Sequence, residues 1–298
     1  MPNSQAAEQL LKRLIATGGL AVRRSADDEA FWYTSGKPGP FYINTEQIAG
    51  RQLAQDVLQR LDDALITDAA AERRAQAIWG ILHQAVRADD QYGAAIEALT
   101  AYYLDRHARP ALISGGERRD WFFSIPMAAR LGVPHVMLFK NGEHQVTDHE
   151  GNAVRLELRG QRVLHVADII NQASSYVNRW IPILNRAGVH FAETLSVAVR
   201  SREGMEKLAD QGVSVLSPLT VDRPLFKEAY ELGLINAFAY REILHYYESP
   251  LDWTRHYIAA MRPARERRLP VKGSEERERH FKAHDPFGLK AEFPAYFV

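Results

Sequence analysis

The hydrophobic pattern of the first hundred residues predicts helices interrupted by one β-rich segment. Residues 5–17 and roughly 47–107 carry apolar positions at helical spacing. Between these helical regions, residues 31–34 and 41–44 are aromatic runs with β preference, joined by a Gly- and Pro-rich stretch. The two runs therefore predict a β-hairpin with a long loop.

From residue 111 the pattern alternates between short apolar strands and amphipathic helices. The predicted strands cover residues 111–113, 134–139, 154–158, 162–167, 191–199 and 213–217. The predicted helices cover residues 120–131, 175–187 and 202–211. The polar stretch 140–152 reads as a mobile loop. This alternation predicts an α/β fold with a largely parallel, doubly wound sheet.

Beyond residue 221 the pattern becomes helical again, with helices expected within 225–232, 235–247 and 253–261. The segment 262–280, rich in Arg and Glu, predicts an exposed arm. Aromatic residues within 281–298 predict that the tail docks onto the body or onto a partner. The expected division is therefore a helix and hairpin (1–50), a helical insert (51–109), an α/β core (110–220) and a helical C-terminal extension (221–298).

Composition narrows the possible classes of function. The 298 residues include 37 basic and 37 acidic side chains, so no overall charge favours nucleic acid or an anionic membrane. No apolar run approaches the ~20 residues of a membrane span, and no secretory signal is visible. The chain has no cysteine, which excludes disulfides and thiolate chemistry. We expect a cytoplasmic protein that binds a small molecule, without nucleic-acid or membrane partners.

The segment around Asp168 carries the most specific chemistry. An apolar run at 162–167 ends at Asp168, a short polar loop follows, and a helix begins at Ser174 and Ser175. Ligands of α/β proteins bind at the carboxyl ends of strands, and a helix start there suits a phosphate. We expect Asp168 to face sugar hydroxyls or a metal. The loop 171–175, with Asn171, would hold the phosphate unless it is simply a capped helix after a core strand.

The order of these segments resembles the type I phosphoribosyltransferases, and the orotate branch most closely. The matching features are Ser-Gly-Lys-Pro-Gly-Pro-Phe-Tyr-Ile-Asn at 35–44, the Gly-rich turn at 114–120, the polar loop and the strand ending at Asp168. The resemblance covers about 5–50 and 110–220, and it implies an N-terminal hood built from the hairpin. It implies transfer of ribose 5-phosphate from phosphoribosyl pyrophosphate (PRPP) to a base nitrogen, with release of pyrophosphate and help from Mg²⁺.

The resemblance also implies roles for individual residues. Arg118 and Arg119 in the Gly-rich turn, and Lys140 at the foot of the polar loop, would bind pyrophosphate. His149 would lie on a catalytic lid. In the family this loop reaches the neighbouring subunit's site, which implies a homodimer. The competing interpretation is an ordinary strand-to-helix turn with solvated arginines and a flexible hairpin with solvated histidines.

Further roles concern the sugar and the base. Asp168 would bind the ribose hydroxyls and, indirectly, the Mg²⁺ that accompanies PRPP, while Ser174 and Ser175 would touch the 5-phosphate. Phe41 and Tyr42 would border the base, orotate or a related one, and Lys37 would meet an anionic group. The protein as a whole would bind PRPP or a nucleoside monophosphate. Alternatively, the hairpin aromatics fill a small core, as we expect for Phe31 and Trp32.

Three positions depart from the family pattern and keep other functions open. Ala167 replaces an acid, Ala173 stands in the phosphate loop, and Thr147 stands where the lid lysine is expected. A catalytically silent relative that keeps the fold for ligand binding or assembly is therefore the second hypothesis. A third is an unrelated doubly wound domain that binds another phosphate ester.

Overall fold

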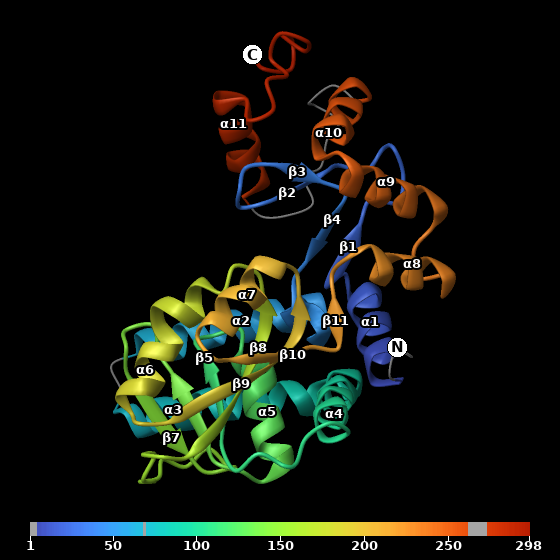
Figure 1. Ribbon diagram of the computed structural model, residues 1–298. Helices are drawn as coiled ribbons and strands as arrows, with labels where there is room; N and C mark the ends of the chain where they lie inside the picture. The colour runs from blue at the N-terminus through green and yellow to red at the C-terminus, as the bar shows by residue number, and fades with distance from the viewer. Residues whose placement is uncertain (1–4, 68–69, 262–272) are drawn as a thin grey trace. The chain divides into compact units, whose positions relative to one another are not determined.

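The computed structural model describes residues 5–67, 70–261 and 273–298 (Figure 1). The chain forms two compact units. The first comprises Met1–Gly19 and Thr45–Val221, and the second comprises Leu20–Asn44 and Asp222–Val298. The hairpin region thus folds with the C-terminal helices. The helical segment 51–109 folds with the α/β core in the first unit.

The first unit is built on one sheet with the strand order β10-β9-β8-β5-β6-β7, in which β11 also pairs with β9. Every pairing is parallel except that of β7, which runs antiparallel to β6. The strands are β5 (Ile113–Gly116), β6 (His135–Leu138), β7 (His144–Thr147), β8 (Arg162–Ile170), β9 (His190–Val199), β10 (Ser214–Leu216) and β11 (Leu219–Thr220). The expected largely parallel α/β sheet is confirmed.

The helices of this unit follow the predicted positions closely. Those before the sheet are α1 (Gln5–Thr17), the 3₁₀ helix η1 (Thr45–Ala49), α2 (Arg51–Ile66), α3 (Ala71–Ala88) and α4 (Asp90–Leu104). Those between strands are α5 (Trp121–Leu131), the π-helix η2 (Tyr176–Trp180), α6 (Ile181–Arg186) and α7 (Arg202–Asp210).

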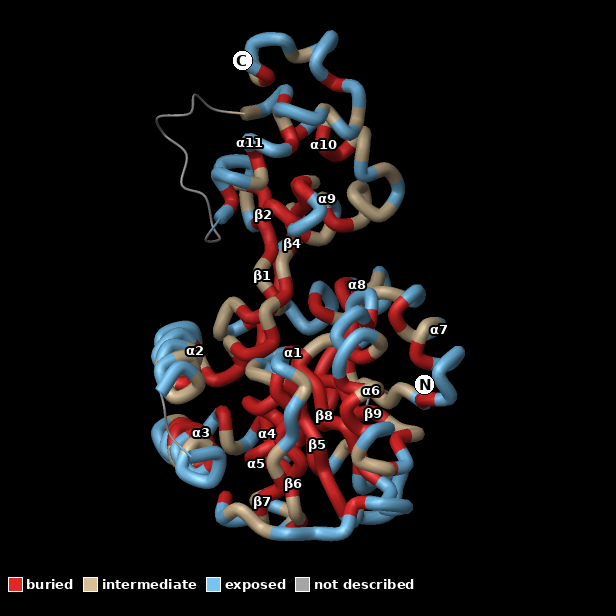
Figure 2. The backbone as a smooth tube through the Cα atoms, turned by 90° about the vertical axis from the view of Figure 1, so that its left-hand side faces the viewer, coloured by how far each residue is buried: buried red, intermediate tan, exposed pale blue. Residues whose placement is uncertain are grey.

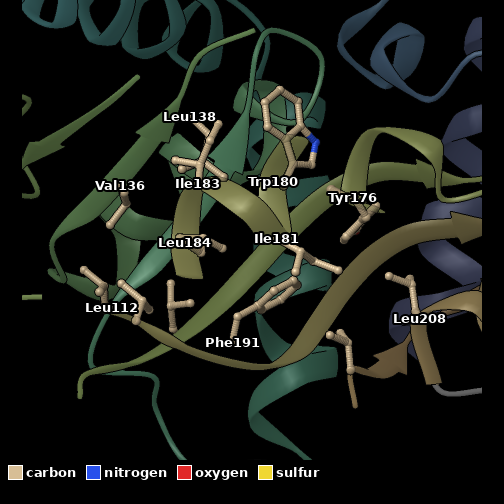
Figure 3. Packing of buried hydrophobic residues seen from close by; sticks show 14 of the residues in the cluster. Leu112, Val136, Leu138, Tyr176, Trp180, Ile181, Ile183, Leu184, Phe191 and Leu208 are labelled. Carbon is tan, nitrogen blue, oxygen red and sulfur yellow. The ribbon is translucent and has the colours of Figure 1, made fainter. Parts of the chain in front are cut away.

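The alternation of side chains along β6 shows how the two faces of the sheet are covered. His135 Nε2 lies 2.9 Å from Ser124 Oγ of α5, whereas the next residue, Val136, belongs to a buried cluster with Trp180 and Ile181. Successive strand residues point to opposite faces. Helix α5 therefore covers one face. The other face is covered by η2 and α6, whose Trp180 and Ile181 lie in the buried cluster (Figure 3). Strand β5 is correspondingly buried throughout, and β8 and β9 are buried over most of their length (Figure 2).

Two sequence-based expectations fail in the region 140–158. Residues 144–147 form strand β7 and not a mobile loop, because Val146 and Thr147 are buried against β6. Residues 154–158 form no strand; only Ala153 makes an isolated bridge, to Thr147. The alternation of apolar and charged residues there places Leu158 in the core, but the segment forms no ladder of hydrogen bonds with any described strand.

The second unit contains β1 (Leu20–Val22), β2 (Phe31–Trp32), β3 (Pro38–Gly39), β4 (Phe41–Ile43), α8 (Arg223–Glu231), α9 (Ala237–Glu248), α10 (Pro250–Ala259) and α11 (Ser274–His284). The two aromatic runs do not pair with each other as expected. β2 pairs with β3 across a tight turn, and β4 pairs with β1. The Pro-Gly dipeptide after the turn thus supplies a short strand that sequence analysis had assigned to a loop.

An aromatic core holds the second unit together. Trp32, Trp253, Phe281 and Phe297 belong to one buried cluster, so the expected docking of the C-terminal aromatics is confirmed, here onto the unit itself. The expected exposed arm lies partly outside the described residues. Its described end is instead α11, because Phe281 anchors this helix in the cluster.

Candidate active site

The carboxyl ends of β5 and β8 form one edge of the sheet. The two strands are parallel neighbours, with Ile113 opposite Leu164 and Ser114 opposite His165, so the segments that follow them begin side by side. A cavity of about 410 Å³ opens at this edge. It is lined by residues 117–120, Lys140, Asp168, Ile169, 171–176 and Trp180. This is the position at which α/β sheets bind ligands.

The turn after β5 is built on a close backbone approach. A Cβ on Gly116 would lie 2.3 Å from Cε2 of Trp180, so only glycine fits at this position without displacing the indole. Sequence analysis assigned Gly115 and Gly116 to a turn, but both belong to β5, whose span is shifted toward the C-terminus. The peptide between Glu117 and Arg118 is cis.

The three basic residues expected to bind pyrophosphate all line this cavity, and each is paired with a carboxylate. Arg118 forms an ion pair with Asp62. Arg119 Nε lies 3.1 Å from Oε1 of the buried Glu46, and Lys140 Nζ lies 3.5 Å from Glu117 Oε1. An anionic ligand would have to compete with these carboxylates for the cations.

Asp168 lies in the same cavity and is 9% exposed. Burial raises its pKa well above the usual value, and the nearby charges of Asp120 and Glu46 raise it further. The N–H of Ile169 donates to Asp168 Oδ1 at 2.6 Å and opposes this shift. The carboxyl therefore holds a proton more readily than an ordinary aspartate does. The structure also shows β8 continuing through Ile170, so Asp168 stands within the strand.

The loop after β8 ends in a helix start that faces the cavity. Helical structure begins at Ser174 and passes into η2, so the first N–H groups there have no acceptor within the helix. Ala173 is buried and has φ 54°, a left-handed conformation that favours glycine. Asn171, Ser174 and Ser175 are exposed to the same cavity. The loop thus keeps the shape in which a phosphate loop needs glycine, although it carries alanine.

His149 lies away from this cavity. Because β7 runs antiparallel, Thr147 is opposite His135 at the amino end of β6, and the residues that follow lie at the opposite edge of the sheet. This turn is held against α3: Gln76 Nε2 donates to Asn152 Oδ1 at 3.4 Å, and Gly151 packs on Trp79. Of this segment, Lys140 reaches the cavity and His149 does not, so the role of His149 on a lid stays a prediction.

The hairpin residues belong to the second unit. Phe41 is 2% exposed, and its ring packs 4.8 Å from that of Phe226, so it is a core side chain and does not offer a face for a base. Phe31 and Trp32 are buried, as expected. Lys37 Nζ lies 4.9 Å above the ring of Phe287, and Tyr42 is only partly buried.

Sequence reasoning missed Asp120, which is 8% exposed and accepts backbone hydrogen bonds from both sides of the cavity. It also missed the carboxylates of Glu46, Asp62 and Glu117 that pair with the cations. The available signal was the position of Asp120 at the start of a predicted helix, where aspartate caps are common. Here its side chain makes no cap of α5. The ion pairs of Glu46 with Arg119 and of Asp62 with Arg118 join residues that are distant in the sequence, so no local pattern indicates them.

No group of three or more His, Cys, Asp or Glu residues in the described part of the chain is arranged to hold a metal ion. Among the same residues, no helix is long and apolar enough to cross a membrane.

The structure is similar to those of a UMP synthase and of an orotate phosphoribosyltransferase. UMP synthase of Leishmania donovani matches with a TM-score of 0.53 and 15% identity over 82% of this chain and 42% of that chain. This chain thus spans about two fifths of that synthase. Orotate phosphoribosyltransferase of Francisella tularensis matches with a TM-score of 0.52 and 11% identity over 80% of this chain and 96% of that chain.

These comparisons show that the chain has a type I phosphoribosyltransferase-like fold, as its sequence predicted. The hypothesis of an unrelated doubly wound domain is therefore not supported. No family model and no curated protein matches the sequence.

Proposed function

We propose that this protein transfers ribose 5-phosphate from PRPP to a base, with release of pyrophosphate. The observation that carries the proposal is the meeting of Asp168, the loop 171–175 and three basic side chains around one cavity of about 410 Å³. A phosphoribosyl donor has hydroxyls, a 5-phosphate and a pyrophosphate. The cavity offers a partner for each of these groups.

The chemistry assigns each group a task. The bond from the ribose C1 to the pyrophosphate oxygen breaks, and a bond from C1 to the base nitrogen forms. Arg118, Arg119 and Lys140 would stabilise the charge that grows on the departing pyrophosphate. The carboxyl of Asp168 would hold a ribose hydroxyl. The N–H groups at the helix start, with Ser174, would hold the 5-phosphate.

Mg²⁺ fits this site as a companion of the donor. The cavity presents the oxygen ligands that Mg²⁺ prefers, from Glu117 and Asp168. Since the described residues form no complete metal cluster, the ion would be held largely by phosphate oxygens, with Asp168 contributing indirectly. When bound, it would neutralise pyrophosphate charge.

Calorimetry with PRPP and Mg²⁺, followed by pyrophosphate release over a panel of bases that includes orotate, tests the proposal. We expect binding and turnover in the natural protein, and loss of turnover by at least about a hundredfold in Asp168→Asn. The control is Asp56→Asn on an exposed face of α2, which should leave turnover unchanged. No binding of PRPP at millimolar concentration rejects the proposal.

A second candidate function is ligand binding without catalysis. It is favoured by the pairing of Arg118, Arg119 and Lys140 with protein carboxylates, which opposes pyrophosphate, and by Ala167, Thr147 and Ala173 in the family motifs. This function predicts binding of ribose 5-phosphate without pyrophosphate release for any base. Turnover that is lost in Asp168→Asn rejects it.

The base and the assembly are proposed from the resemblance, and the location is proposed from the composition. Orotate or a related base is the expected acceptor, the protein is expected to be cytoplasmic, and a homodimer is expected. The homodimer has weaker support, because the segment that would reach a neighbouring site packs here on α3. Light scattering after gel filtration measures the oligomeric state.

A further inference from the structure

Asp120 lines the cavity and accepts hydrogen bonds from the backbone of both strands that border it. Its Oδ2 accepts the backbone N–H of Gly116 at 3.0 Å, and its Oδ1 accepts that of Asp168 at 3.1 Å. Gly116 ends β5 and begins the turn that carries the arginines. Asp168 stands in β8, just before the loop with the serines. One buried carboxylate is thus bonded to the backbone on both sides of the cavity.

The reason for this arrangement lies in the sheet. The registered pairs of β5 and β8 end at Ser114 and His165, so the strands separate where the cavity opens. The N–H groups of Gly116 and Asp168 face this gap, and a buried N–H without an acceptor is costly. Asp120 supplies the two acceptors that a continued ladder would have supplied. It therefore fixes the distance between the two turns.

The surroundings hold this carboxylate in place. His165, which is fully buried, places Nε2 3.5 Å from Asp120 Oδ2, and its Nδ1 lies 3.0 Å from Ser114 Oγ. The indole N–H of Trp121 donates to the carbonyl of Gly115 at 3.0 Å and fixes the same turn from the other side. A movement of the turn after β5 would therefore displace Asp120 and, with it, the backbone of β8 before the loop that carries the serines.

We propose that Asp120 is a positioning residue that couples the turn after β5 to the loop after β8, so that pyrophosphate bound at one favours ribose 5-phosphate bound at the other. This inference rests on the proposed function, because it presumes that both segments bind phosphates. Coupling between two ligands is reciprocal and is measured as a ratio of affinities. Such a ratio separates positioning from a general contribution to folding.

The decisive variant is Asp120→Asn. Asparagine keeps one oxygen acceptor, but its amino group donates and cannot accept, so one of the two backbone N–H groups loses its partner. The control is Asp148→Asn at the opposite edge of the sheet. It removes the same charge from a carboxylate that accepts two backbone N–H groups, from Glu150 and Asn152, but both bonds go to Oδ1, which asparagine keeps.

Calorimetry would measure the Kd of ribose 5-phosphate with and without saturating pyrophosphate and Mg²⁺. In the natural protein and in Asp148→Asn, we expect pyrophosphate to lower this Kd by about fivefold or more. In Asp120→Asn the ratio should fall to about one, while each ligand alone still binds. If Asp120→Asn does not unfold cooperatively, Asp120→Glu, which keeps both acceptors but displaces them, should give an intermediate ratio.

The outcomes are separable. If the natural protein binds neither probe, the proposed function fails, and this inference fails with it. If both probes bind but their ratio is one in the natural protein, or is unchanged in Asp120→Asn and Asp120→Glu, the inference alone is wrong. A loss of both affinities with the ratio retained assigns Asp120 a purely structural role and also overturns it.

Discussion

Gly116 and Trp180 are in such close contact that a Cβ on the glycine would lie 2.3 Å from the indole Cε2. Trp180 is almost fully buried in the core that covers one face of the sheet (Figure 3). The floor of the cavity is therefore set by the packing of an aromatic side chain against a bare backbone. The shape of the turn that carries Arg118 and Arg119 depends on this contact.

Replacing Gly116 by alanine should accordingly be destabilising. Overpacking of a filled core costs about 1–3 kcal/mol, and we expect the free energy of unfolding to fall by that amount. Urea denaturation measures it. The control is Gly80→Ala within α3, where an added Cβ meets nothing within 4 Å and should stabilise the helix by up to about 1 kcal/mol. Equal stability of Gly116→Ala and the natural protein would contradict the role of this contact.

Replacing Ala173 by glycine should be tolerated or stabilising. The residue has φ 54°, a conformation that costs alanine about 1–2 kcal/mol and glycine almost nothing. Part of this gain is offset by the loss of a buried methyl group. We expect a melting temperature equal to or up to about 4 °C above that of the natural protein. Ala129→Gly, within the helix α5, should lower it instead. A clear decrease in Ala173→Gly means that the loop is not strained.

The order of helices and strands along the chain could be predicted from the sequence, because hydrophobic periodicity is a local property. The apolar run at 162–167 became β8, and the repeat across 51–104 became α2 to α4. The pairing of strands is not a local property, so the wrong predictions concern which strands pair with each other. β2 pairs with β3 across a tight turn, and the polar segment around Val146 pairs with β6 as an edge strand.

Residues of the candidate site could be predicted only where they lie at or just after the carboxyl end of a predicted strand. Asp168, Lys140 and Ser174 were expected at the carboxyl edge, and the cavity brings them together. His149 does not line this cavity, because the reversal of β7 carries it to the other edge of the sheet. Asp120 was missed because its contact with Asp168 spans 48 residues. The catalytic and binding roles themselves stay predictions.

Replacing Asp62 by asparagine should increase the affinity for pyrophosphate. Asp62 pairs with Arg118, and its side chain is 47% exposed, so the pair contributes little to stability. Removing the carboxylate leaves the guanidinium available and removes one negative charge near the ligand. We expect pyrophosphate with Mg²⁺ to bind about three- to tenfold more tightly in calorimetry at low salt, with a smaller gain at high salt.

The control for this experiment lies on the same helix. Asp56 lies 3.7 Å from Arg60 of α2, and neither residue lines the cavity, so Asp56→Asn removes the same charge without changing the pairing of Arg118. An equal gain in both variants would indicate a general effect of net charge. No gain in Asp62→Asn would mean that Arg118 does not contact pyrophosphate.

Replacing Asp168 by asparagine should stabilise the protein at neutral pH. The pKa of Asp168 is raised in the folded protein by burial, and further by Asp120 and Glu46. Between the ordinary pKa near 3.9 and the raised value, the folded state keeps a proton that the unfolded state has lost. The stability contributed by this group is therefore fully present below about pH 4, and it is lost as the pH rises through the folded pKa.

Asparagine does not ionise and avoids this loss, and its Oδ1 can still accept the N–H of Ile169. We expect melting temperatures that are similar at pH 4, and a value for Asp168→Asn about 2–4 °C higher at pH 8, on the order of 1 kcal/mol. Asp56→Asn, at an exposed site, should show no such difference between the two pH values. A residue kept at a cost in stability is typical of a functional site. If Asp168→Asn instead melts lower at pH 8, the buried carboxylate stabilises the fold, and this argument for a binding role is lost.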